Sequence, residues 1–352
     1  MYKVSQETKN AYKSDASHKE IVIRIPDANI TLTNEDIVSE SLELKEAIES
    51  SENLSFQGCI SSSLKIEVFT LVDDTLEGMW IEADIKADQT ETIPLFRGYI
   101  SEVTNQTHEE YTAVIRAYDA LYKINKTDVT SWYNSLTFPM TVQAFRNSFF
   151  QRVGVTQVAD YLTNDGVTIQ KTIEDKVIMG AKIIKAICQI NGRFGRISRT
   201  GRFEYVHLTE AAEALYPAED LYPAEDIYPS DENAVDNVLK AHYTKIKFEN
   251  YRVASINKVQ IVAKSGAIVA TAGNGDNGLS QASLNAVARN LYNTVQGLWY
   301  TPSNVNCVGL PYVECGDFVL MTARLSIIRA YVLSRTLKGI QAITDAYKAP
   351  GD

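Results

Sequence analysis

The chain has 352 residues, of which 45% are hydrophobic and 22% are charged, so it is long enough for two or three hydrophobic cores. Its 34 Lys and Arg and 44 Asp and Glu give a formal net charge of −10, which disfavours a basic nucleic-acid-binding protein. The charge is uneven, with 10 basic and 23 acidic residues in positions 1–120, 13 and 15 in 121–240, and 11 and 6 in 241–352. This asymmetry indicates domains that face different surroundings, or each other.

Residues 1–120 carry the pattern of short β-strands. Apolar and polar side chains alternate over residues 20–25, and Pro26 with Asp27 provides a turn before residues 30–33. Similar alternation, separated by turns, predicts further strands at residues 64–71, 79–85, 95–103 and 111–117. Strands at this spacing are typical of an antiparallel barrel or sandwich.

Residues 121–240 change to a helical period. Thr141 is a predicted helix cap, apolar residues then recur at steps of three and four, and Gly154 is a stop signal. A second helix is expected over residues 181–190, ending at Gly192, where a left-handed cap is needed. A hairpin follows, with strands over residues 193–197 and 202–207 around Gly201.

A hexad repeat occupies residues 215–232, with the copies LYPAED, LYPAED and IYPSDE. Each proline fixes its own φ and pushes the preceding tyrosine out of the helical region. The segment contains six acidic and no basic residues. Three short, proline-containing copies are too few for a solenoid, so we interpret the segment as an ordered connector crossing a domain surface.

The last third returns to strands and contains one helix. Strands are expected over residues 243–248, 258–263, 267–272, 317–322, 327–336 and in a final stretch up to 342, and a helix over 280–292. The order along the chain is therefore β-rich, mixed and β-rich.

Two motifs could bind ligands but have simpler explanations. The run from Gly273 to Gly278 satisfies G-x-G-x-x-G, but no Asp or Glu follows between Asp276 and Glu314 to bind a ribose, so tight-turn glycines with Ser280 as helix cap explain it better. Asp276, Asn277 and the acidic hexads lack the ligand pattern of a helix-loop-helix calcium site. A solvated acidic connector is the preferred interpretation.

Four arginines lie within ten residues around the predicted hairpin, at Arg193, Arg196, Arg199 and Arg202. Odd and even positions of a strand point to opposite faces, so the four cannot share one patch unless the turn brings them together. A contact with nucleic acid is one interpretation. A polar rim that contacts an acidic neighbour is the one that we prefer.

Several functional classes lack their sequence signals. Residues 1–20 are polar without a signal-peptide core, so we expect folding in the cytoplasm, and the longest uncharged stretch, residues 290–313, is too polar and proline-interrupted to insert into a membrane. No zinc spacing, nucleophile elbow or HExxH helix appears. We therefore predict no catalytic, cofactor-binding or metal-binding residues and no enzymatic activity. The scattered histidines and the cysteines, the latter predicted to be buried and reduced, are His18, His108, His207, His242, Cys59, Cys188, Cys307 and Cys315.

Segments in order along almost the whole chain resemble the central hub proteins of phage tails and phage-like particles, including the amino-terminal part of tail-associated lysins. Their specificity comes from order and spacing, because none is a catalytic signature. The segments are 56–67 (FQGCISSSLKIE), 94–100 (PLFRGYI), 114–124 (VIRAYDALYKI), 132–139 (WYNSLTFP), 183–197 (IIKAICQINGRFGRI), 201–205 (GRFEY), the repeated Leu-Tyr-Pro hexads, 312–320 (YVECGDFVL) and 332–340 (VLSRTLKGI).

The resemblance implies a fold and a set of partners. It implies a mainly β chain in which two tube-like antiparallel barrels, residues 1–120 and 240–352, flank a mixed α+β middle domain, residues 121–239. Three copies would form a ring that adapts a sixfold tail tube to a threefold spike or fibre and closes the tube before ejection. The implied partners are a homotrimer, a tail tube or distal tail protein, a spike or fibre protein and a tape-measure protein. DNA would pass through the lumen without stable binding.

Two other functions remain open. Lysin-type members of the family continue into a peptidase or glycosidase module, so the chain could be the anchoring part of a tail-associated cell-wall hydrolase. It could also be a carbohydrate-binding adhesin at the tail tip. Activity on peptidoglycan would favour the first, and binding of intact host cells the second.

Overall fold

The polypeptide folds mainly into antiparallel β-sheet, with few helices, which confirms the mainly β class. The computed structural model describes residues 1–14, 16–49, 54–55, 58–70, 74–106, 111–158, 161–208, 246–247, 250–255, 258–262, 268–272, 287, 290–291, 299–323 and 326–349.

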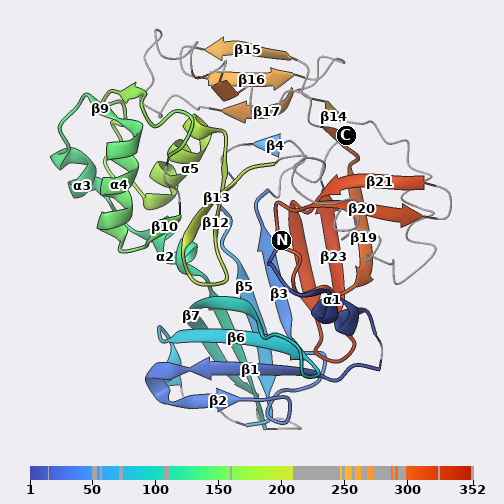
Figure 1. Ribbon diagram of the computed structural model, residues 1–352. Coiled ribbons are helices and arrows are strands. Elements are labelled where there is room, and N and C mark those ends of the chain that lie inside the picture. The colour runs from blue at the N-terminus through green and yellow to red at the C-terminus, as the bar shows by residue number, and fades with distance from the viewer. Residues whose placement is uncertain are drawn as a thin grey trace.

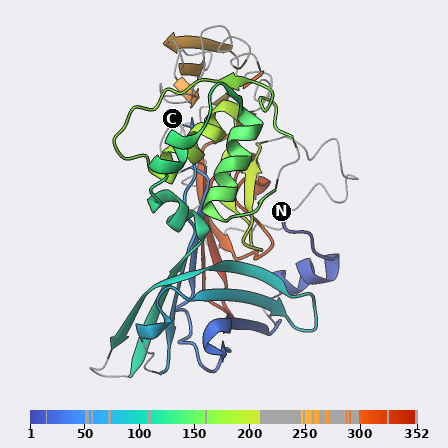
Figure 2. The same cartoon turned by 90° about the vertical axis from the view of Figure 1, so that its left-hand side faces the viewer.

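One ten-stranded antiparallel sheet dominates the molecule and runs through the lower half of Figure 1. Viewed from the side, it extends away from the helices (Figure 2). In spatial order its strands are β19 (Ser303–Val308), β23 (Thr344–Ala349), β22 (Ser334–Lys338), β3 (Glu43–Ala47), β5 (Ser63–Val68), β8 (Thr112–Tyr118), β7 (Ile93–Gln106), β6 (Trp80–Ala87), β1 (Lys19–Ile25) and β2 (Ile30–Leu32).

Alternating side chains give this sheet one buried face. In β1, Ile21, Ile23 and Ile25 are buried while the residues between them are partly exposed, and β5 repeats the pattern. This is the period-2 pattern that predicted strands in the first third of the sequence. The predicted strands there match β1, β2, β5, β6, β7 and β8 to within a few residues.

The first and last thirds of the chain meet inside this sheet. β22 pairs with β3 in antiparallel register, with Leu337 opposite Leu44 and Lys338 opposite Glu43. Both leucines are fully buried. The sequence pattern did not indicate β3 or β19. The pairing of β3 with β22 makes the two ends of the chain one continuous sheet.

The helices gather beside the sheet at the upper left of Figure 1, except for α1, which lies near the amino terminus. The two helices predicted in the middle third are confirmed: the Thr141 hydroxyl accepts a hydrogen bond from the Ala144 amide, and Gly154 and Gly192 end their helices with positive φ. The helices are α1 (Gln6–Lys13), α2 (Ala120–Lys126), α3 (Thr130–Ser135), α4 (Val142–Val153) and α5 (Gly180–Asn191), with short 3₁₀ turns at Pro26–Ala28 and Asp74–Leu76.

One segment predicted as strand changes to helix. Residues 114–124 resemble closing strands of a hub barrel, but β8 ends at Tyr118 and α2 begins at Ala120. The cause is Asp119, whose carboxylate accepts the Leu121 amide hydrogen bond and caps the helix. The strand that alternation predicts over residues 111–117 therefore ends close to the end of β8, and the rest of the resembling segment is helix.

The carboxy-terminal strands also differ from the prediction. Residues 327–336 are not one strand: β21 (Ser326–Tyr331) pairs with β20 (Phe318–Ala323), and β22 starts at Ser334 in the large sheet. Between them, Val332 and Leu333 hydrogen-bond to other segments, so the chain changes sheet there. The last strand, β23, lies beyond residue 342, where the prediction ended.

Among the described residues, the ten-stranded sheet has no pairing between its outer strands β19 and β2, so it is not a closed barrel. The two tube-like barrels and their boundaries stay predictions.

The remaining strands form small sheets. The small sheets join β10 (Gln157–Val158), β13 (Phe203–Val206) and β12 (Phe194–Ile197); β11 (Thr168–Ile169) and β9 (Met140–Thr141); β14 (Ile246–Lys247) and β18 (Trp299–Tyr300); β15 (Asn250–Ser255), β16 (Lys258–Val262), β17 (Ile268–Ala272) and β4 (Leu54–Ser55); and β20 with β21.

Parts of three sequence predictions lie outside the described residues. These are the hexad repeat over residues 215–232, the glycine run over 273–278 and most of the helix predicted over 280–292. Within that last range, residues 287, 290 and 291 are helical. No helix of the described residues is long and apolar enough to cross a membrane.

Candidate functional site

The four arginines around the β12–β13 hairpin do not form one basic patch. Arg196 and Arg199 point to the loop over residues 310–317, which precedes β20. Arg202 is exposed, and Arg193 is half-buried, which lowers the pKa of its guanidinium. The hairpin therefore turns two of its four cations toward the carboxy-terminal part of the chain.

Arg196 joins its own hairpin to this loop. Its Nε donates to Glu204 on the neighbouring strand at 2.9 Å, and its Nη1 donates to the Cys315 carbonyl at 2.7 Å. Its Nη2 also lies 3.4 Å from the carboxylate of Glu314. The predicted contact with an acidic neighbour is confirmed at this residue.

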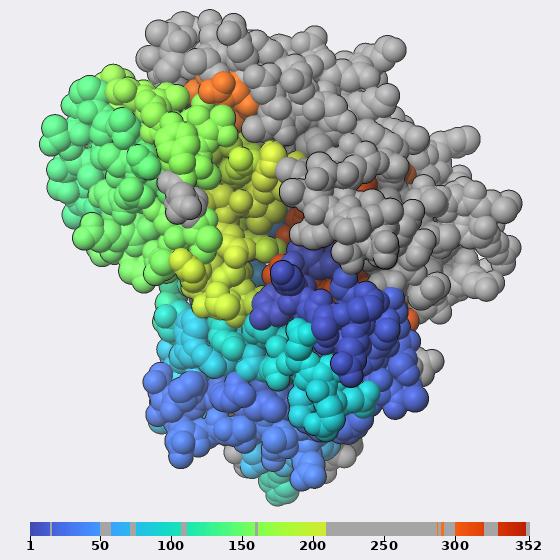
Figure 3. Space-filling view, viewed as in Figure 1, coloured from blue at the N-terminus to red at the C-terminus, as the bar shows by residue number. Residues whose placement is uncertain are grey.

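Arg199 is buried and binds two segments outside its own hairpin. Its Nη2 donates to the Val313 carbonyl at 2.7 Å, and its Nη1 donates to the carbonyls of Pro311 and Pro94. Its Nε forms an ion pair with Glu314 at 3.3 Å. One guanidinium thus joins the hairpin, β7 and the loop over residues 310–317. In Figure 3 the yellow surface near residue 200 lies between the green middle part and the dark blue amino-terminal segment.

Glu314 is the acidic partner of both arginines. Burial alone would raise the pKa of Glu314, but the positive charges of Arg199, Arg196 and the chain's amino group outweigh burial and lower it to about 2. The amino group of Met1 lies 3.6 Å from Glu314 and also pairs with Asp317. Glu314 is therefore ionised at neutral pH and acts as a structural counter-ion.

Arg335 holds the same loop from the sheet side. From β22 it makes two hydrogen bonds with Asp345, at 3.0 and 2.9 Å, and donates to the carbonyls of Leu310 and Val313. Val313 thus accepts from both Arg199 and Arg335. We call residues 310–317, held between these two guanidinium groups, the arginine-clamped loop. These polar contacts hold the loop in place and have a structural role.

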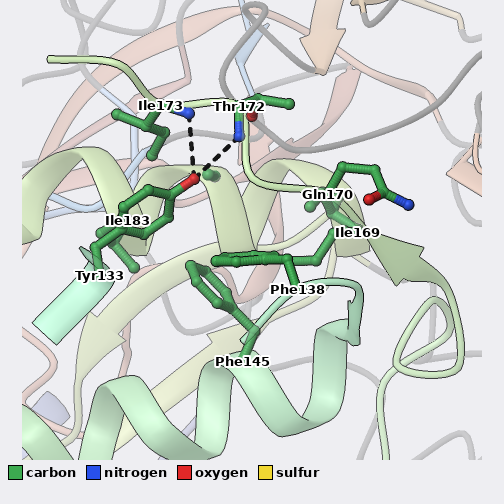
Figure 4. Close-up of a pocket in the computed structure, with 10 residues that line it drawn as sticks. Tyr133, Phe138, Phe145, Ile169, Gln170, Thr172, Ile173 and Ile183 are labelled. Atoms are coloured by element: carbon green, nitrogen blue, oxygen red, sulfur yellow. Dashed lines mark hydrogen bonds between the residues drawn. The ribbon is translucent and has the colours of Figure 1, made fainter. Parts of the chain in front are cut away.

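An aromatic pocket lies among the helices (Figure 4). The Tyr133 hydroxyl accepts hydrogen bonds from the amides of Thr172 and Ile173, each at 3.1 Å. The free space is about 10 Å³, enough for about one water molecule and not for a substrate. Its lining residues are Tyr133, Phe138, Phe145, Ile169, Gln170, Thr172, Ile173, Ile183, Ala186 and Ile190.

A second, equally small pocket lies beside Asp119. Burial raises the pKa of Asp119 to about 6, which in a cleft can mark a catalytic acid. Here, however, its oxygens accept hydrogen bonds from the Ser62 and Leu121 amides and the Ser61 hydroxyl. These contacts attach the start of α2 to the segment before β5. Asp119 is therefore a helix cap, and the pocket's free space of about 10 Å³ leaves no room for a substrate.

The described residues contain no group of three or more His, Cys, Asp or Glu side chains that could hold a metal ion. Two motifs that were considered as ligand-binding sites lie outside the described residues: the glycine run over residues 273–278 and the acidic hexads. The four cysteines are buried and free. The polar clusters found here are structural.

Exposed apolar side chains are the surface feature that sequence analysis missed. Phe69 follows β5 and is 55% exposed, and Tyr111 precedes β8 and is 69% exposed. Because β5 and β8 pair with Val68 opposite Ala113, these two aromatic residues stand at the same end of the sheet. Tyr161 and Val177 are also exposed, in loops of the helical part. The strand register places the segments that carry Phe69 and Tyr111 at the same end of the sheet, which the sequence pattern alone does not show.

Comparisons with known proteins identify the fold. No protein-family model matches the chain, and no curated protein matches its sequence. The chain is similar to the solved structure of the 43 kDa tail protein of prophage MuSo2 from Shewanella oneidensis, at 9% identity and a TM-score of 0.54, over 94% of this chain and 98% of that one. It is equally similar to a tail protein from Neisseria meningitidis MC58, at 9% identity and a TM-score of 0.54, over 95% and 96% of the two chains. The chain therefore has the fold of prophage tail proteins, as its sequence resemblance predicted.

Proposed function

We propose that this chain is a non-enzymatic structural component of a phage tail or phage-like particle, acting as its central hub. The observation that carries this proposal is the shared fold with two prophage tail proteins over almost the whole length of each chain. The two pockets described above agree with it, because neither can admit a substrate. A hub acts through surfaces that join other proteins.

In the proposed assembly, three copies form a ring whose two tube-like domains, residues 1–120 and 240–352, present six similar surfaces to a tail tube or distal tail protein. The middle domain, residues 121–239, faces a spike or fibre protein, and the tape-measure protein ends at the hub. The ring closes the tube before ejection and lets DNA pass afterwards. A closed cyclic ring also covers strand edges that would otherwise be exposed.

The test is the state of assembly of the purified full chain. We expect light scattering to give the mass of a trimer at high concentration, and electron microscopy to show threefold particles. A chain that stays monomeric at every concentration would contradict the proposal.

The exposed aromatic pair allows a sharper form of this test. The double variant Phe69→Ser/Tyr111→Ser should lower the trimer fraction without lowering the melting temperature, because both side chains are mostly in solvent in the single chain. Tyr161→Ser, equally exposed but in the helical part, is the matched control and should assemble normally. Equal assembly of both variants would show that the pair lies outside the interface.

A further inference from the structure

Two of the four buried cysteines lie in direct contact. The sulfur atoms of Cys59 and Cys188 are 3.5 Å apart, although 129 positions separate the residues in the sequence. Cys188 lies on α5, and Cys59 lies in the short segment before β5 that forms a bridge with Gly195 of β12. The contact therefore connects the segment leading into the large sheet with the helical layer.

The packing around Cys59 holds its sulfur in this position. A Cβ atom at Gly195 would lie 2.6 Å from the Cys59 sulfur and 2.6 Å from the Phe203 ring. Any residue with a side chain at this position would therefore displace the sulfur. The Gly195 amide also donates to the Gly58 carbonyl at 2.8 Å, which fixes the backbone beside Cys59. The sulfur thus fills the space that glycine leaves, next to Cys188.

We propose that Cys59 and Cys188 form an oxidation site that closes to an intramolecular disulfide. A disulfide needs its sulfur atoms about 2.05 Å apart, so closure requires a relative shift of about 1.5 Å. With a peroxide as oxidant, one thiol is oxidised to a sulfenic acid and releases one water. The second thiol then attacks that sulfur and releases another water. Overall, two S–H bonds and one O–O bond break, one S–S bond and two O–H bonds form, and peroxide takes both electrons.

The short distance between the two sulfur atoms, and not a low thiol pKa, makes oxidation selective for this pair. Burial raises the pKa of the Cys188 thiol, so the reactive thiolate is scarce and oxidation is slow. Burial raises the pKa of Cys307 and Cys315 in the same way. Cys307 lies on β19 beside Tyr347 and Asp345, and Cys315 lies in the arginine-clamped loop. Only Cys59 and Cys188 have a thiol partner among the sulfur contacts of the described residues.

The bond would restrain the unfolded chain. Closing a loop of this length restricts the unfolded state strongly, so the oxidised chain should melt about 5 °C higher than the reduced chain. It should also migrate faster on a denaturing gel without reductant.

The experiment treats the folded, full-length chain with excess hydrogen peroxide and blocks the remaining thiols before digestion. We expect mass spectrometry to find a peptide pair that links Cys59 to Cys188, and an intact mass lower by two hydrogen atoms. The Cys307→Ser/Cys315→Ser variant is the control that should still form the link. Cys59→Ser and Cys188→Ala should each abolish it.

Two results would overturn the inference. One is that Cys59 and Cys188 of the folded, unaltered chain are recovered as separately blocked or overoxidised thiols. The other is that the linked pair is a different one, such as Cys307 with Cys315. Because both are read from the unaltered protein, neither depends on the folding of a variant.

Discussion

Several buried charged side chains of this protein lie beside opposite charges. Arg146 makes two hydrogen bonds with Asp165, at 2.8 and 2.6 Å, and both side chains are almost completely buried. Arg335 with Asp345 repeats the arrangement in the large sheet. Removing one member of such a pair leaves the other charge in a poorly solvated place, and this costs more than the pair itself contributes.

At Glu314 this reasoning gives a first prediction. Glu314→Gln removes the charge that faces Arg199 and Arg196, so the free energy of unfolding should fall by about 3 kcal/mol at pH 7. Urea denaturation measures the change. The matched control is Glu102→Gln, because Glu102 pairs with Arg116 at 3.6 Å with both side chains about half-exposed. That control should change stability by about 0.5 kcal/mol or less.

The pH dependence of this difference follows from the lowered pKa. Glu314 has a pKa of about 2 in the folded chain, against about 4.3 when unfolded, so its contribution is complete above about pH 4.3 and is lost as the pH falls through about 2. The difference in the free energy of unfolding between the unaltered chain and the Glu314→Gln variant should therefore become smaller below about pH 4. A gap of constant size from neutral pH to pH 2 would contradict this assignment.

The ends of α4 and the end of α5 are set by single residues that satisfy or release the helix backbone. α4 begins after Thr141 and ends at Gly154, and α5 ends at Gly192; both glycines have positive φ. A residue with a Cβ is strained in that conformation. The boundaries of the helices are thus properties of single residues acting on their own backbone.

At the start of α4, the cap gives the second prediction. Thr141→Ala removes the hydroxyl that accepts from the Ala144 amide at 3.2 Å, so stability should fall by about 1 kcal/mol. Thr137→Ala changes an exposed threonine in the preceding loop and should leave stability within about 0.5 kcal/mol. Urea denaturation of both variants checks this. Equal losses would mean that the cap does not stabilise α4.

At the scale of the whole molecule, the large sheet makes the first and last thirds of the chain one unit. The paired strands β3 and β22 place fully buried Leu44 opposite Leu337. Strands on both sides of this join depend on it for their hydrogen bonds and buried area. The two ends of the chain should therefore unfold together.

Leu337→Ala tests this cooperation as the third prediction. It should lower stability by about 2 to 5 kcal/mol, the range for truncating a buried leucine. Hydrogen exchange should show that protection falls together in β5, from the first third, and β23, from the last. Leu136→Ala, at a half-buried leucine in the helical part, should cost less and spare both strands. Loss of protection in β23 alone would mean that the two thirds unfold separately.

The charge asymmetry of the chain concerns assembly. Some of the opposite charges of the first and last thirds meet within one chain, as Lys338 and Glu43 do at 3.0 Å, and Arg335 and Glu46 at 3.4 Å. The first third, with 13 more acidic than basic residues, still differs strongly from the last, with 5 more basic than acidic. In a ring of three copies these unlike surfaces would alternate.

Salt should therefore slow the proposed association of subunits. Raising the ionic strength from about 0.05 M to about 0.5 M shortens the range of electrostatic attraction, so the rate of trimer formation should fall at least several-fold. Time-resolved light scattering measures the rate, and melting curves at both salt concentrations control for a change in the subunit itself. A rate that does not respond to salt would remove charge steering from the proposal.

The part of the fold that sequence predicted is the part set by local chemistry. Alternation identified β1 and β5, because an antiparallel strand with one buried face repeats every second residue. Thr141 and Gly192 marked helix ends because their side chains, or the lack of one, act on the adjacent backbone. The sequence predicted that the hairpin arginines contact an acidic residue, but it did not identify that residue as Glu314.

Sequence alone determined that the chain is mainly β, where most strands and two helices lie, and that it resembles phage tail hubs. Only the tertiary structure decided that β3 pairs with β22, that Arg199 and Arg335 hold one loop from two sides, and that Cys59 touches Cys188. Hydrophobic periodicity and caps act over a few residues, so they can be read along the chain. Contacts between residues more than a hundred positions apart depend on the path of the folded backbone, which no local pattern encodes.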